Sequence, residues 1–75
     1  SMIKIETTAE KVNEALGKIR EVGTVSVRDN GGSFSAKGVE GRFSYKDGVL
    51  SIAIDDKPWL ASDSMIESEI RKFFN

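Results

Sequence analysis

The chain has 75 residues, a length typical of one domain, and its 11 basic and 12 acidic residues give a net charge of −1. Cysteine and histidine are absent, which excludes disulfides and the usual protein ligands of zinc or iron–sulfur centres. The near-neutral charge provides no overall field for nucleic acid, and no apolar run approaches the ~18 residues of a membrane span. We therefore expect one soluble, cytoplasmic domain over residues 1–75, with Ser1 left by tag cleavage.

The first part of the chain predicts a strand followed by a helix. Apolar and polar side chains alternate over residues 2–6, as in a short strand. Residues 7–10 read Thr-Thr-Ala-Glu, a capping-box sequence in which the Thr7 hydroxyl accepts a hydrogen bond from the Glu10 amide. Apolar residues then recur at helical spacing as far as Val22, and Gly23 supplies the stop.

Three turn signals in residues 25–54 predict a meander of four antiparallel strands. Asn30-Gly31 favours a two-residue turn, because both positions of that turn need positive φ, and this turn pairs Val27 with Phe34. Asp47-Gly48 is an equally strong signal and pairs Tyr45 with Leu50.

The segment between these turns, residues 38–41, is a weaker signal because Val39 and Glu40 disfavour positive φ. If it also turns over two residues, Phe34 faces Tyr45. The three turns then place one apolar set on a single face, and a slip of one residue would scatter that set. Its members are Val25, Val27, Phe34, Ala36, Phe43, Tyr45, Leu50, Ile52 and Ile54.

After the meander, a connection at residues 57–60 leads to a second capping-box sequence that starts at Ser64. Apolar residues follow it at helical spacing up to Phe74. The predicted fold is α+β, an antiparallel β-meander in the order β-α-β-β-β-β-α with two helices packed on one face. The first strand has two possible places, parallel to residues 25–29 through a right-handed crossover or beside residues 49–55.

No catalytic, cofactor or metal site is indicated by the sequence. Histidine, the commonest general base, is missing, and the glycines at 31–32, 38 and 41 are typical of hairpins rather than of a phosphate cradle. Asp55-Asp56 lacks the spaced acidic companions of a calcium or magnesium loop. We expect no enzyme activity, no cofactor and no metal.

The polar face of the predicted sheet is a first candidate surface. The expected register gathers the serines at 26, 35, 44 and 51 into one row, and flanking rows carry Arg28, Lys37, Arg42 and Lys46. These charges are typical either of a solubilising face or of a weak nucleic-acid binder. Because the sheet's aromatic residues fall on the core side, base stacking is missing and nucleic acid is not the expected partner.

The second candidate surface is apolar. Trp59, the single tryptophan, lies in a connection, where it either caps the edge of the core or anchors a partner. Phe73 and Phe74 are 100° apart on a helix, so both cannot point into the core. We interpret Trp59, Leu60, Phe73 and Phe74 as partner-binding residues. The small core further favours a homodimer that buries the second helix and the Trp59 loop.

Several segments resemble the polyhydroxyalkanoic acid system proteins of bacteria. Residues 34–45 contain a Gly-Val-Glu-Gly step, where that family shows a similar Gly-Val-Asp-Gly step, and residues 66–70 match its Ile-Glu-x-Glu-Ile closing helix. The similarity covers roughly residues 34–74. The chain departs from the family after the first strand, where Glu6, Thr7 and Thr8 replace basic and histidine residues. The resemblance implies a small, non-enzymatic bacterial protein associated with polyhydroxyalkanoate granules.

Three functions are therefore expected, in order of preference. The first is a non-enzymatic binding or assembly protein, linked through the resemblance to polyhydroxyalkanoate granules. The second is a small inhibitor or immunity-type protein that blocks one protein partner. The third is a weak nucleic-acid binder that uses the basic polar face.

Overall fold

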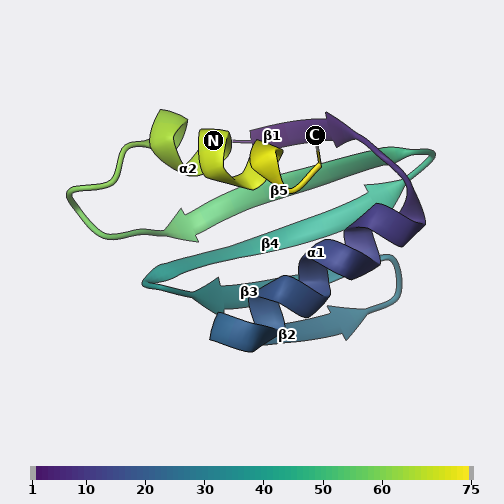
Figure 1. The fold of residues 1–75 in the computed structure, drawn as a ribbon, viewed down its shortest axis with the longest axis horizontal. Helices are drawn as coiled ribbons and strands as arrows, with labels where there is room; N and C mark the ends of the chain where they lie inside the picture. The colour runs from purple at the N-terminus through teal and green to yellow at the C-terminus, as the bar shows by residue number, and fades with distance from the viewer. Residues whose placement is uncertain (1, 75) are drawn as a thin grey trace.

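The computed structural model describes residues 2–74 as one five-stranded antiparallel sheet with both helices on the same face (Figure 1). The strands lie in the order β1-β5-β4-β3-β2, so the α+β meander predicted from the sequence is confirmed. In Figure 1, α1 crosses the β2–β4 half of the sheet, whereas α2 lies beside β1 and β5. The elements are β1 (Met2–Glu6), α1 (Ala9–Val22), β2 (Gly23–Arg28), β3 (Gly31–Ala36), β4 (Val39–Lys46), β5 (Val49–Asp56) and α2 (Asp63–Lys72).

β1 takes the second of its two possible places. It pairs antiparallel with β5, so that Ile3 lies opposite Ile52 and Ile5 opposite Leu50. This pairing leaves β1 and β2 as the two edges of the sheet. β1 and β2, which follow one another in the chain with α1 between them, are thus separated by the whole width of the sheet.

The β4–β5 register is the predicted one, with Tyr45 opposite Leu50, but the β3–β4 register is different. Its turn is formed by Lys37 and Gly38, at φ values of 53° and 81°, and not by the two residues after Gly38. Phe34 consequently faces Gly41 instead of Tyr45. A β-carbon on Gly41 would lie 2.8 Å from the Phe34 ring, so the glycine makes room for the aromatic side chain.

The β2–β3 register also differs from the prediction. Its turn uses Asp29 (φ 55°) and Asn30, so that Phe34 pairs with Val25 and Val27 pairs with Gly32. A β-carbon on Gly32 would overlap the Ser26 carbonyl oxygen, so a larger residue could not take this position. Close backbone approach, and not positive φ, is therefore what this glycine provides.

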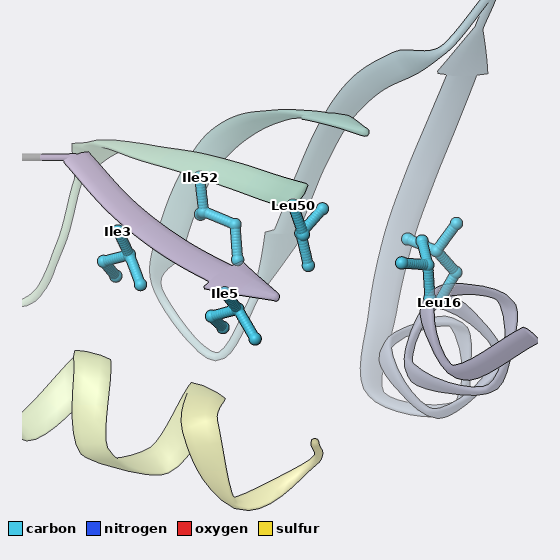
Figure 2. Close-up of a cluster of buried hydrophobic side chains, with 6 residues drawn as sticks. Ile3, Ile5, Leu16, Leu50 and Ile52 are labelled. Atoms are coloured by element: carbon cyan, nitrogen blue, oxygen red, sulfur yellow. The ribbon is translucent and has the colours of Figure 1, made fainter. Parts of the chain in front are cut away.

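The core lies between the sheet and the helices, and it is most deeply buried around β1 and β5. Figure 2 shows Ile3 and Ile5 of β1 beside Leu50 and Ile52 of β5, with Leu16 reaching the cluster from α1. These five side chains are between 2% and 8% exposed. Most of the predicted apolar face packs on this cluster, but Val27, near the end of the edge strand β2, is 52% exposed.

Both helices begin at residues other than the predicted caps. Thr8 is the N-cap of α1, and its hydroxyl accepts from the Lys11 amide at 3.2 Å. Thr7 lies before the cap, where its amide donates to the Gly48 carbonyl (2.9 Å) and its carbonyl accepts from the Tyr45 hydroxyl (3.0 Å).

In α2, the cap is Ser62, whose hydroxyl accepts from the Met65 amide at 3.2 Å. The predicted cap, Ser64, falls in the first helical turn, with its hydroxyl 3.2 Å from that of Ser62. Neither helix, over the residues described here, combines the length and apolar character needed to cross a membrane.

Candidate functional site

The segment between β5 and α2, residues 57–62, forms a turn that we call the Trp59 loop. The Ala61 amide donates to the Pro58 carbonyl at 2.9 Å, which places Trp59 and Leu60 at the tip. Pro58 lies against the β3–β4 turn, since a β-carbon on Gly38 would be 3.1 Å from its Cγ. The neighbouring hairpin thus supports the loop from one side.

Polar contacts hold both ends of the Trp59 loop. The Lys57 amide donates to the Asp56 carboxylate at 3.0 Å, and the Lys57 ammonium lies 2.8 Å from Oδ1 of Asp63. Ser62 then ends the loop as the cap of α2. These contacts fix the backbone on either side of the tip, so an apolar partner would meet a loop that is already ordered.

The two residues at the tip are the most exposed large apolar side chains described. Trp59 is 89% exposed and Leu60 is 75% exposed, so neither covers the core. The interpretation of Trp59 as a cap on the core edge is therefore wrong. An indole can bury about 150–250 Å² against a partner while losing few rotamers, which makes it an efficient anchor.

The closing phenylalanines divide as their helical spacing requires. Phe74 packs against the core, whereas Phe73 is 46% exposed and has the Lys18 ammonium 6.0 Å from its ring centroid. Further exposed apolar residues that sequence reasoning missed include Met65 (59%) and Val22 (54%). Met65 could have been found, because it lies one residue before Ile66 on the apolar stripe of α2. Val22 was predicted on the stripe of α1, but it is the last residue of that helix and is exposed.

A depression between α1 and α2 was also missed, and its described lining is wholly apolar. The lining residues come from both helices and from the sheet, among them Ala15, Ile19, Phe34, Phe43, Phe73 and Phe74. The sequence predicted that both helices cover one face, but it could not predict how far apart they lie. That separation depends on tertiary packing.

The polar face differs from the predicted arrangement of serines and basic residues. Ser44 does lie opposite Ser51, but Ser26 pairs with Ser33, so the expected row of four serines does not form. Lys37 lies in the β3–β4 turn at φ 53° and not in a row of the sheet. Both errors follow from the register shifts described above.

Arg42 is not a free cation on this face, because Asp55 binds it. Its Nε and Nη2 donate to the Asp55 carboxylate at 2.8–3.2 Å, a bidentate pair with both side chains solvent-accessible. The hydrogen bonds from Arg42 are the main cause that lowers the pKa of Asp55, and those bonds likewise raise the pKa of Arg42. Arg28 and Lys46 are exposed at the other end of the face.

Within residues 2–74, no group of three or more acidic side chains is placed to hold a metal ion. The surfaces with a defined chemistry are thus the apolar tip of the Trp59 loop, the depression between the helices and the polar sheet face. Comparisons with protein-family models, with curated proteins and with solved structures find no match for this chain.

Proposed function

We propose that the protein is a non-enzymatic binding protein whose contact surface is the tip of the Trp59 loop. The observation that carries this proposal is the 89% exposure of Trp59 on a loop held by hydrogen bonds and an ion pair at its base. Exposing a tryptophan in water has a cost in free energy, since burial of a large apolar side chain stabilises by about 1.5–3 kcal/mol. Binding to an apolar surface recovers this free energy.

The surrounding charges suit such a role. The ion pair between Lys57 and Asp63 lies beside the tip, so charged groups border the apolar centre. Protein and particle contacts that exclude water from a central aromatic anchor have this arrangement. Because the loop is ordered before contact, little conformational entropy is lost on binding.

The partner that we propose first is an apolar polyester surface, as the resemblance to the polyhydroxyalkanoic acid system proteins suggests. The test is co-sedimentation with polyhydroxybutyrate particles of the parent protein, of Trp59→Ser and of Val22→Ser. Val22 is 54% exposed on α1 and is the matched control. We expect Trp59→Ser to lose binding and Val22→Ser to retain it. Equal binding by all three proteins would reject the loop as the contact.

A protein partner is the second candidate. The small size of the tip favours a protein partner, because two apolar residues beside charged groups resemble the hot spot of a protein–protein interface. If the parent protein does not sediment with the particles, the polyester assignment fails. Affinity capture with the parent protein and with Trp59→Ser then tests whether the tip binds a protein partner. A protein retained by the parent and by Val22→Ser, but not by Trp59→Ser, supports an inhibitor-type role.

The nucleic-acid hypothesis has weaker support. Its basic face depends on Arg42, which is bonded to Asp55, and on Lys37, which lies in a turn.

A further inference from the structure

The two edges of the sheet are protected differently. On β1, the Lys4 carbonyl accepts a hydrogen bond from the Arg71 guanidinium of α2 at 3.2 Å, so a side chain already occupies this edge. β2 is the other outermost strand, and Figure 1 shows no element beyond it. No hydrogen bond from a side chain described here reaches the β2 backbone.

The register of the hairpin determines which backbone groups of β2 face outward. Arg28 and Gly31 close a two-residue turn and so form a hydrogen-bonded pair, and the pattern alternates along the strand. Ser26 therefore bonds with β3, in agreement with its carbonyl oxygen lying against Gly32. The N–H and C=O groups of Val25 and Val27 point away from the sheet.

We propose that this edge pairs with β2 of a second copy, antiparallel across a two-fold axis at Ser26. Val25 of each copy then lies opposite Val27 of the other, and each valine pair can exchange two backbone hydrogen bonds. Val27 is 52% exposed and borders a depression between α1 and the hairpin, which the pairing would partly cover. The two five-stranded sheets become one sheet of ten strands.

The charges on the polar face select this partner and this register. One row across the sheet runs from Arg28 through Ser44 and Ser51 to Lys4 and is basic at both ends. In the proposed dimer, Arg28 lies opposite Thr24 of the second copy.

Thr24 begins a different row, which continues through Ser35 to Glu40 and Asp56. The two-fold axis thus joins the basic row of each copy to the acidic row of the other, and no like charges face each other across the new pairing. Because both junctions are equivalent by symmetry, this arrangement of charges favours a second copy of the chain as the occupant of the edge.

The first test combines molar mass with amide exchange. Sedimentation equilibrium from micromolar to millimolar concentration should show a monomer–dimer equilibrium. Exchange of the Val25 and Val27 amides should slow as the dimer forms, whereas the Ser26 amide, bonded within one copy, should change little. A monomer throughout the range, or a dimer in which the two valine amides exchange as in the monomer, would overturn the proposal.

Variants separate this edge from the other apolar surfaces. Val27→Pro removes an outward N–H without breaking a bond to β3, and it should weaken dimerisation at least about tenfold. Val27→Thr keeps the N–H and the β-branched shape and should dimerise like the parent. If Val27→Pro does not fold, as judged by circular dichroism, Val27→Lys replaces it. This variant places a charge on the edge and should also weaken dimerisation.

The variant Trp59→Ser distinguishes a dimer formed by the β2 edges from a dimer formed through the Trp59 loop. We expect this variant to dimerise with the parent affinity even where it loses its binding partner. A dimer that is lost in Trp59→Ser and kept in Val27→Pro would overturn the edge pairing and place self-association on the loop.

Discussion

The two faces of the sheet divide stability from surface chemistry. On the face under the helices, Ile3, Ile5, Leu50 and Ile52 are all less than 7% exposed. On the other face, most side chains are exposed, and the Arg42–Asp55 pair is accessible to solvent on both sides. The tip of the Trp59 loop belongs to neither face. The residues at the tip can therefore change with little effect on the core.

Burial also varies from one edge of the sheet to the other on the face under the helices. Burial is deepest at β1 and β5 and declines toward β2, where Val25 is half-buried and Val27 is 52% exposed. The proposed pairing of β2 edges would extend the covered face on this less buried side.

The largest expected effect is at β5. Ile52→Ala should lower the free energy of unfolding by about 2–5 kcal/mol, because it leaves a cavity in the most buried cluster. Val27→Ala, on the same face, should lower it by less than about 1 kcal/mol. Urea unfolding of the monomer measures both values. Similar costs at the two positions would show that the core is spread evenly over the sheet.

The next effect tests the contact between β3 and β4. A β-carbon on Gly41 would lie 2.5 Å from the Ala53 carbonyl oxygen and 2.8 Å from the Phe34 ring, so Gly41→Ala should destabilise by about 1–3 kcal/mol. Gly17, within α1, has no atom within 4 Å of such a β-carbon. Gly17→Ala should stabilise by about 0.5–1 kcal/mol. Thermal unfolding of the two variants should shift in opposite directions.

The register errors explain why one face was predictable and the other was not. Phe34 was expected opposite Val27 and Tyr45, and it lies opposite Val25 and Gly41, which are shifts of two and four residues. An even shift keeps every side chain on its own face, because side chains alternate with a period of two. The apolar set therefore remained together, while the predicted row of four serines did not form.

The turn that caused the larger error has a physical explanation. Gly38 can serve as the second turn residue with Lys37 before it, and this choice spares Val39 and Glu40 from positive φ. The sequence had already indicated that those two residues disfavour a turn. The close approach of Phe34 to Gly41 could not be predicted, because it depends on which strands are neighbours.

Part of the candidate site was predictable for a simpler reason. Trp59 lies outside any periodic apolar pattern, so its side chain was a candidate for exposure from the start. The depression between the helices, the occupied β1 edge and the Arg42–Asp55 pair were not predicted. The depression and the β1 edge depend on segments far apart in the sequence that meet only in the folded chain. The Arg42–Asp55 pair is a diagonal contact within the β4–β5 hairpin, and it depends on the side-chain conformations of both residues.

A smaller effect separates the two threonines before α1. The Thr7 hydroxyl is buried without a hydrogen-bond partner, so Thr7→Val should be neutral or stabilise by up to about 1 kcal/mol. Thr8 caps the helix, so Thr8→Ala should destabilise by about 0.5–2 kcal/mol. Chemical unfolding of both variants checks this. A larger loss of stability in Thr7→Val than in Thr8→Ala would instead support the capping box at Thr7 that the sequence predicted.

The smallest effect concerns the exposed ion pair. Arg42 lowers the pKa of Asp55 in the folded protein, so the pair stabilises the fold above the unfolded pKa of about 3.9. This contribution is lost as the pH falls through the lower, folded pKa. Because the pair is exposed, we expect its loss at low pH to change the free energy of unfolding only slightly, and the change should depend on salt concentration. NMR titration should show a low pKa for Asp55 in the parent and an ordinary one in Arg42→Gln. An ordinary pKa in both would contradict the pairing.

The central claim, that the tip of the Trp59 loop is the contact surface, has a direct optical test because Trp59 is the single tryptophan. In the free protein, its emission should be that of a water-exposed indole. On polyester particles, or with a captured protein partner, the emission of the bound fraction should shift to shorter wavelength and become protected from a soluble quencher. Emission and quenching that stay unchanged, while sedimentation or capture shows that the protein is bound, would contradict the claim.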